Sequence, residues 1–137
     1  MSDEFSPYAL VADDDGIIRM DCALILQDAG YRVHEAANVE EALAILDRAG
    51  ESIQLLFTDV QMPPSTRNGF ELARLCADTW PRIKILVASG NTAPKPGDLP
   101  DGAVFIHKPF SADIVYDRLQ LLLPDGAKPE PLKKRAT

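Results

Sequence analysis

Five short apolar segments alternate along the chain with stretches in which apolar residues recur every three or four positions. Unbroken apolar runs of strand length are typical of strands buried on both faces of a parallel sheet. The periodic stretches are typical of helices with one apolar face. We therefore expect strands at residues 8–12, 32–36, 55–59, 83–88 and 103–106.

Helices are expected between the strands, and their ends carry capping residues. Asn38 with Glu41 has the spacing of a capping pair, and Ser111 is a typical N-cap. Gly30 is typical of the position just after a helix end. The expected helices cover about residues 17–29, 39–49, 70–79 and 112–123.

Residues 91–102 interrupt this alternation because their prolines and Gly97 cannot share a regular helix. The other units connect parallel strands by right-handed crossovers. This predicts an α/β fold, a doubly wound, flavodoxin-like (βα)5 domain with a parallel five-stranded sheet in the order 2-1-3-4-5. Its fourth helix is expected to be short or absent.

The charge of the chain argues against nucleic-acid and membrane partners. The 137 residues carry a net charge of −7, whereas a nucleic-acid surface needs a basic patch. The basic cluster at residues 133–135 is expected to be a solvated end. No apolar run approaches membrane-spanning length, and the acidic start lacks the pattern of a signal peptide. We expect a cytoplasmic protein.

Length and composition fit one domain. A 46% hydrophobic composition is enough for a core without disulfides or structural metals. We expect an N-terminal extension at residues 1–7, the domain at 8–123 and a polar C-terminal tail at 124–137. Cys22 and Cys76 fall in helical patterns far apart, which favours buried thiols in a reducing compartment.

Polar side chains are predicted to converge at one edge of the sheet. Asp13 and Asp14 follow the first strand and Asp59 ends the third, and the two strands are neighbours in the predicted order. Such close carboxylates need a cation, and hard oxygen ligands favour magnesium, with manganese as the alternative. Ser89 and Lys108 add a hydroxyl and an ammonium from the last two strands. Phosphoryl transfer requires this combination.

Four motifs carry a resemblance to a known family. They are Leu-Val-Ala-Asp-Asp-Asp at residues 10–15, Phe-Thr-Asp-Val-Gln-Met-Pro at 57–63, Val-Ala-Ser-Gly at 87–90 and Lys-Pro-Phe at 108–110. In this order, at successive strand ends, they resemble the signatures of response regulator receiver domains, over about residues 8–123. The loop from Asp59 to Gly69 is about two residues longer than the family pattern.

The resemblance implies a phosphoacceptor and a metal site. Asp59 would accept a phosphoryl group from the phosphohistidine of a histidine kinase or histidine phosphotransfer protein. Asp14 would bind Mg²⁺ directly and Asp13 through water, while Asp59 and the backbone carbonyl of Gln61 would complete the protein ligands. The aspartyl phosphate is expected to be labile, so the domain would be a signalling module and not an enzyme in the ordinary sense.

The resemblance also implies how the phosphate is held and sensed. The Ser89 hydroxyl would bond the phosphoryl group and the Lys108 ammonium would pair with it. Phe105 lies at the aromatic switch position, whose ring would turn inward as Ser89 moves toward phosphate. Because the fourth helix commonly transmits the signal, we expect residues 91–101 to do so instead, by ordering on phosphorylation.

Two helix faces are candidate contact surfaces. The core stripe expected on the first helix is Ile18, Cys22, Ile25 and Ala29. A second apolar stripe of Ile17, Met20 and Leu24 lies on the opposite side, and the resemblance assigns it to docking of the phosphodonor. On the last helix, Ile114 and Leu121 lie off the core stripe and are candidates for a dimer or output contact. We expect a monomer or weak homodimer.

Two alternative functional hypotheses use the same residues. In the first, the Asp13 to Gly16 turn resembles that of haloacid-dehalogenase-type phosphatases, with Asp13 as nucleophile and Asp15 as acid; the chain is short for a cap domain, however, and Asp59 would have no role. The second is an interaction module that is never phosphorylated, although every chemical position is filled. The sequence fits both a stand-alone receiver and a piece of a hybrid histidine kinase.

Overall fold

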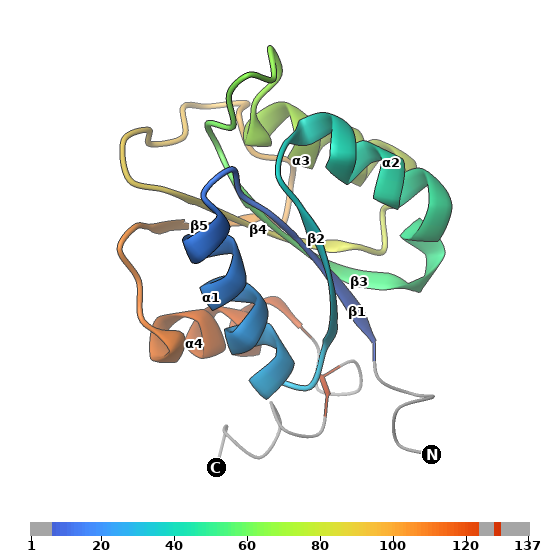
Figure 1. The fold of residues 1–137 in the computed structure, drawn as a ribbon, viewed down its shortest axis with the longest axis vertical. Coiled ribbons are helices and arrows are strands. Elements are labelled where there is room, and N and C mark those ends of the chain that lie inside the picture. The colour runs from blue at the N-terminus through green and yellow to red at the C-terminus, as the bar shows by residue number, and fades with distance from the viewer. Residues whose placement is uncertain (1–6, 124–127, 130–137) are drawn as a thin grey trace.

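Five parallel strands form one sheet between two layers of helices in the computed structural model, which describes residues 7–123 and 128–129 (Figure 1). The sheet order is β2-β1-β3-β4-β5, so the predicted doubly wound fold is confirmed. Most of the expected N-terminal extension and tail, including the basic cluster, lies outside the described residues. The strands are β1 (Tyr8–Ala12), β2 (Arg32–Ala36), β3 (Ile53–Asp59), β4 (Lys84–Ser89) and β5 (Val104–His107).

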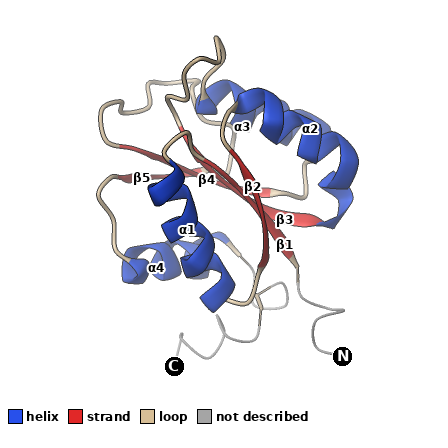
Figure 2. Cartoon of the chain, in the orientation of Figure 1, coloured by secondary structure: helices blue, strands red, loops and turns tan. Residues whose placement is uncertain are grey.

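Helices cover both faces of the sheet (Figure 2). One face packs against α1 and α4, and the other against α2 and α3. A short 3₁₀ turn, η2 (Gly50–Ser52), leads from α2 into β3. The helices are α1 (Gly16–Asp28), α2 (Val39–Ala49), α3 (Gly69–Thr79) and α4 (Ala112–Leu122).

Each helix begins at a polar side chain that accepts backbone N–H groups. Asn38 and Ser111 are N-caps as predicted, and Asp15 caps α1. Asn68 and Glu71 form a reciprocal capping box at the start of α3, which the sequence reading missed. These caps bond N–H groups that have no partner inside the helix.

The central strand β3 contributes to two separate cores. Leu56 faces the α2 and α3 side, whereas Leu55 and Phe57 face α1 and α4. Successive strand residues point to opposite faces, so the apolar run at the centre of β3 supplies side chains to both cores.

The predicted core stripe of α1 faces the sheet. Cys22 and Ala29 are buried, and Ile18 and Ile25 pack against the same core while remaining half-buried. The fully buried residues of the helix itself are Cys22, Ala23 and Leu26, with Ala29 buried at its C-cap.

No helix occurs between β4 and β5, as predicted, although this segment is described throughout. A turn at residues 95–98 is closed by a bond from the Asp98 N–H to the Lys95 carbonyl, with Gly97 at a φ of 87°. The Arg74 guanidinium ties the Asp98 carbonyl to α3 at 2.8 Å. Prolines and a positive φ therefore replace the fourth helix by an anchored loop.

His34 on β2 is half-buried, and its ring stacks on that of Tyr8 with centroids 4.6 Å apart. Burial, with a smaller effect of nearby Arg48, lowers the pKa of His34.

Among the described helices, none is both long and apolar enough to cross a lipid bilayer.

Candidate functional site

The carboxyl ends of four neighbouring strands deliver the predicted site residues to one edge of the sheet. Asp13 follows β1 directly, while Asp59 and Ser89 are the last residues of β3 and β4. Lys108 follows β5. This edge is the top left of the sheet in Figure 1. It is where open α/β folds bind their ligands.

Three carboxylates meet there. One oxygen from each of Asp13, Asp14 and Asp59 lies within 4.8 Å of the other two. Asp13 is buried, Asp59 half-buried and Asp14 exposed, so the cluster opens to solvent on one side. A set of carboxylate oxygens with room for water fits Mg²⁺ better than a soft transition metal.

Lys108 places a fixed cation between two of the acids. Its Nζ lies 2.8 Å from Oδ2 of Asp13 and 3.2 Å from Oδ1 of Asp59. The lysine side chain is 18% exposed and the two carboxylates 4% and 11%. The short distances and limited exposure make this a partly desolvated charge network, in which Coulomb energies exceed those of surface ion pairs.

The environment shifts the pKa values of this network in defined directions. Burial, then the neighbouring charge of Asp13, raises the pKa of Asp59, although Lys108 and the Val60 N–H act against this. Burial alone would lower the pKa of Lys108, but bonds and charges from both acids outweigh it and raise the pKa. The Lys108 side chain therefore remains protonated. The ionised form of Asp59 is less stable here than the ionised form of an ordinary aspartate.

One oxygen of Asp59 is left available. Within the described chain, the Val60 N–H at 2.8 Å and the Lys108 ammonium both contact Oδ1. Oδ2 receives no hydrogen bond from the described residues. A carboxylate held through one oxygen can present the other to an electrophile in a fixed direction.

The backbone of Asp59 is also held in place, by residues that the sequence reading missed. The buried Thr58 hydroxyl donates to the Asp59 carbonyl at 2.7 Å. The first residue of α3, Gly69, packs so closely that a Cβ atom there would overlap the same carbonyl. The Asn68-Gly69 pair was visible in the sequence, but this close approach depends on the fold.

Ser89 is buried at the end of β4 and its side-chain oxygen is already engaged. Oγ accepts the N–H groups of Asn91 at 3.3 Å and Thr92 at 3.1 Å. A hydroxyl also carries one proton that it can donate. The Ser89 carbonyl accepts the Lys108 N–H at 3.0 Å, which fixes the two site residues relative to each other.

Gln61 and Phe105 are placed near the site but outside the acid cluster. The exposed Gln61 side chain donates to the Thr92 hydroxyl at 3.1 Å. Phe105 is half-buried on β5, against the core on the α2 and α3 side, with its ring edge-on to that of His107. The predicted switch role of Phe105 and the metal role of the Gln61 carbonyl stay predictions.

Asp15 serves a structural purpose. Its Oδ1 accepts the N–H groups of Ile17 at 2.9 Å and Ile18 at 3.1 Å, and it does not belong to the acid cluster. The phosphatase hypothesis needs Asp15 as a catalytic acid near Asp13. Because the Asp15 carboxylate instead caps α1, the geometry favours the receiver hypothesis.

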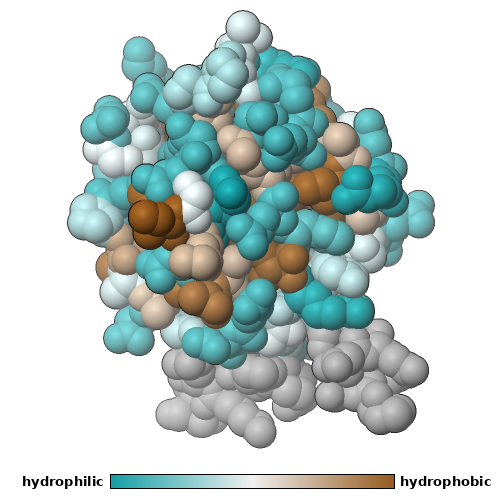
Figure 3. All heavy atoms as spheres, viewed as in Figure 1, coloured by the Kyte–Doolittle hydropathy of each residue, from teal (hydrophilic) through white to brown (hydrophobic). Residues whose placement is uncertain are grey.

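The predicted docking stripe on α1 is exposed. Ile17, Met20 and Leu24 have 77%, 55% and 52% of their surfaces exposed. Brown, apolar surface is visible over α1 in Figure 3. Ile114 and Leu121 on α4 are also exposed, at 40% and 76%. Both candidate contact surfaces therefore face outward as the helical spacing predicted.

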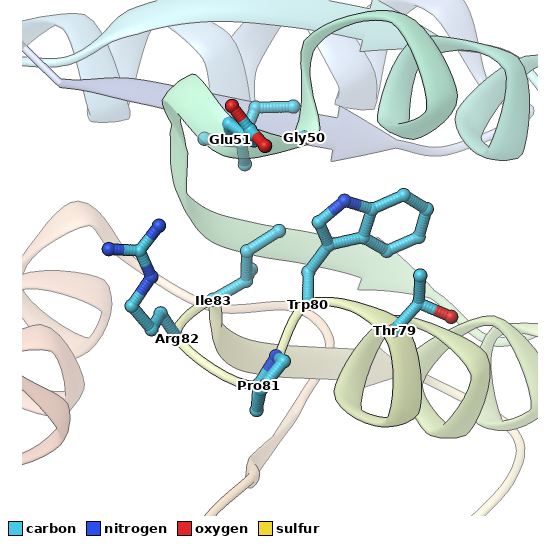
Figure 4. Close-up of a pocket in the computed structure, with 8 residues that line it drawn as sticks. Gly50, Glu51, Thr79, Trp80, Pro81, Arg82 and Ile83 are labelled. Atoms are coloured by element: carbon cyan, nitrogen blue, oxygen red, sulfur yellow. The ribbon is translucent and has the colours of Figure 1, made fainter.

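A separate depression lies at the opposite edge of the sheet, where β3 and β4 begin. Figure 4 shows Trp80 between α3 and η2, with its indole ring turned toward Gly50. Glu51 and Arg82 are among the lining residues. A Cβ on Gly50 would overlap the indole, so the glycine leaves space for the ring. This depression contains none of the acid cluster and is remote from Asp59.

Comparison with known proteins gives a consistent result. Residues 9–120 match the family described as the response regulator receiver domain. The chain is 36% identical over 111 residues to "Sensor kinase CckA" of Brucella abortus, and 33% identical over 107 residues to "Nitrogen assimilation regulatory protein NtrX" of Azorhizobium caulinodans. These matches cover 77% and 76% of this chain but only 11% and 23% of those relatives.

Solved structures show the same fold. The receiver domain of hybrid histidine kinase CckA aligns with a TM-score of 0.72 at 28% identity, covering 85% of this chain and 99% of that one. Chemotaxis protein CheY4 of Vibrio cholerae aligns with a TM-score of 0.72 at 31% identity, covering 85% and 98% of the two chains.

Proposed function

This chain belongs to the response regulator receiver domain family, and we propose on that basis that it takes a phosphoryl group onto Asp59 in a Mg²⁺-dependent reaction. The donor is a phosphohistidine of a histidine kinase or histidine phosphotransfer protein. The product is an aspartyl phosphate that changes which proteins the domain contacts. The domain is a signalling module that catalyses its own phosphorylation and dephosphorylation.

One observation carries the proposal: the carboxylates of Asp13 and Asp14, from the end of β1, and the ammonium of Lys108, from the end of β5, meet around Asp59. The ammonium and a bound Mg²⁺ offset the repulsion between the aspartate and the incoming phosphoryl oxygens. Asp13, Asp14, Asp59 and the Gln61 carbonyl are the residues that would hold this ion, with Mn²⁺ as a substitute.

The chemistry is a substitution at phosphorus. Oδ2 of Asp59 forms the new O–P bond as the N–P bond of the phosphohistidine breaks, and the electron pair of that bond stays on the departing imidazole. Lys108 pairs with the transferred group and the Ser89 hydroxyl donates its proton in a hydrogen bond to a phosphoryl oxygen. Asp59 reacts as its carboxylate, so no proton has to be removed from it as the new bond forms.

The exposed stripe on α1 is the proposed docking surface for the donor. Ile17, Met20 and Leu24 lie on the helix that begins beside the acid cluster, so a helical partner packed there could bring its histidine to Asp59. The protein acts in the cytoplasm as a monomer or weak homodimer. It is a stand-alone response regulator or the receiver of a hybrid histidine kinase.

The experiment is to incubate the protein with acetyl phosphate and Mg²⁺ and to map the modified residue by tandem mass spectrometry. The proposal predicts a phosphoryl group on Asp59 that hydroxylamine removes, as expected of an acyl phosphate. Modification of Asp13 would instead favour the haloacid-dehalogenase-type phosphatase hypothesis. No modification, with Mg²⁺ demonstrably bound, would favour an interaction module that is never phosphorylated.

A further inference from the structure

Asp14 is the exposed member of the acid cluster, and its carboxylate is not held directly. One of its oxygens lies within 4.8 Å of oxygens of Asp13 and Asp59, but in the described part of the chain no hydrogen bond reaches it. The orientation of this carboxylate therefore depends on the two peptide groups that flank its Cα atom. A ligand that is oriented in advance loses less conformational entropy when it binds an ion.

Both of these peptide groups are fixed by hydrogen bonds. The carbonyl of Asp13, which precedes Asp14, accepts from Nη1 of Arg19 at 2.9 Å. The N–H of Asp15, which follows Asp14, donates to Oδ1 of Asp13 at 2.9 Å. The second bond forms within the turn itself, whereas the first comes from α1. Arg19 is therefore the side chain that fixes the peptide group between Asp13 and Asp14.

Arg19 is itself held by a residue of β2. Its Nε lies 3.2 Å from Oε1 of Glu35, and the two side chains are 24% and 44% exposed. Because Glu35 compensates the charge of the guanidinium, the pair adds no net charge beside the proposed cation site. An ion pair as exposed as this contributes little to the stability of the fold. The bond that it supports, from Arg19 to the Asp13 carbonyl, is the more specific contact.

We infer that Arg19 is a positioning residue for Mg²⁺: its bond to the Asp13 carbonyl orients the Asp14 carboxylate toward the ion, and Glu35 orients Arg19. The inference rests on the proposed function, in which Asp14 is a ligand of the ion. Removing a hydrogen-bond partner that orients a metal ligand typically weakens metal binding by about 10–100-fold.

The charge of Arg19 and its hydrogen bond act on metal binding in opposite directions. A guanidinium beside the acid cluster repels a divalent cation, so the loss of its charge alone would strengthen Mg²⁺ binding. The loss of the bond that orients Asp14 would weaken Mg²⁺ binding. The sign of the change in affinity therefore separates positioning from a simple effect of charge.

The test is thermal unfolding of the whole protein over a series of Mg²⁺ concentrations. The midpoint without Mg²⁺ reports the stability of the fold, and the rise of the midpoint with Mg²⁺ gives the dissociation constant of the ion. Arg19→Met should raise this dissociation constant about tenfold. A purely structural role of Arg19 would instead lower the midpoint without Mg²⁺ and leave the dissociation constant unchanged.

Glu35→Gln gives a second measurement at an exposed side chain, which decides the question even if Arg19→Met does not fold. It should weaken Mg²⁺ binding about threefold, because Arg19 is then less well held and its charge is uncompensated. The same change should have less effect in the Arg19→Met background, since Glu35 acts through Arg19. Arg82→Met is the matched control: it removes an exposed arginine beside the depression at the opposite edge and should leave Mg²⁺ binding unchanged.

If Arg19→Met binds Mg²⁺ as tightly as the parent or more tightly, the inference is overturned and the proposed function stands. Equal weakening in Arg82→Met, or an unchanged dissociation constant in Glu35→Gln, would overturn it as well. If Mg²⁺ does not raise the unfolding midpoint of the parent at all, the proposed Mg²⁺-dependent function fails, and the positioning role fails with it.

Discussion

The ammonium of Lys108 lies 2.8 Å from Oδ2 of Asp13, although the two residues are 95 positions apart. The contact joins the ends of β1 and β5, which β3 and β4 separate in the sheet. It lies over the end of β3 and brings the lysine to Asp59 as well. A single cation thus connects the two outer strand ends of the site across Asp59.

Replacing Lys108 with methionine should destabilise the protein. Asp13 would remain buried without its ammonium partner, and such a loss costs about 1–3 kcal/mol. We expect urea unfolding at pH 7 to show this decrease, and added Mg²⁺ to restore part of it by compensating the carboxylates. Lys95→Met, at an exposed lysine, is the control. Equal unfolding midpoints for the two variants would contradict the structural role.

Asp14 and Asp15 are adjacent but should respond differently to Mg²⁺. Mg²⁺ at a hundred times its dissociation constant should stabilise the parent by about 2.7 kcal/mol. Asp14→Asn should lose most of this, because Asp14 belongs to the acid cluster. Asp15→Asn should retain it, because Asp15 caps α1 and asparagine is an equally good cap. Thermal unfolding with and without Mg²⁺ distinguishes them, and equal losses in both variants would refute the assignment.

Gly69 should not tolerate a side chain. Alanine there would force α3 away from the Asp59 carbonyl, at a cost of about 1–3 kcal/mol, and would slow phosphorylation by displacing Asp59. Gly16→Ala is the control, since its added Cβ would meet the Arg19 guanidinium at an ordinary 3.7 Å. Urea titration and labelling rates measure both effects. A fully stable Gly69→Ala variant would show that the close approach has no consequence.

Asp59→Asn should stabilise the protein at neutral pH by about 0.5–2 kcal/mol, because it removes a carboxylate destabilised by burial and by Asp13. In the folded parent the pKa of Asp59 lies above 3.8, the ordinary aspartate value. The parent protein therefore loses stability as the pH rises from 3.8 through this higher pKa, because the unfolded chain releases its proton first. The advantage of the variant should therefore be small below pH 3.8 and full at neutral pH.

Asp78→Asn, at an exposed aspartate on α3, makes the same change in net charge and is the control for this pH series. An advantage for Asp59→Asn that grew toward acid pH, or one matched by Asp78→Asn, would contradict the inferred destabilisation of Asp59.

The fold could be predicted from the sequence because its signals are local. The apolar run through Leu55 and Phe57 has the composition of a doubly covered strand, and the prolines at 94 and 96 exclude a regular helix there. The convergence of Asp13, Asp14 and Asp59 also followed, since the strand order alone brings those strand ends together.

What could not be predicted depends on contacts between distant segments. Thr92 is an ordinary loop residue in the sequence, and only the structure brings its hydroxyl to Gln61. Thr58 and Gly69 likewise acquire their importance from how closely they approach the Asp59 carbonyl. The stacking of His34 on Tyr8 required the register between two strands.

The most direct test is the intact mass of the parent and of Asp59→Asn after identical incubation with acetyl phosphate and Mg²⁺. Our account predicts that the parent gains the mass of a single phosphoryl group and that the variant gains none. A variant labelled to the same extent and at the same rate as the parent would mean that Asp59 is not the phosphoacceptor.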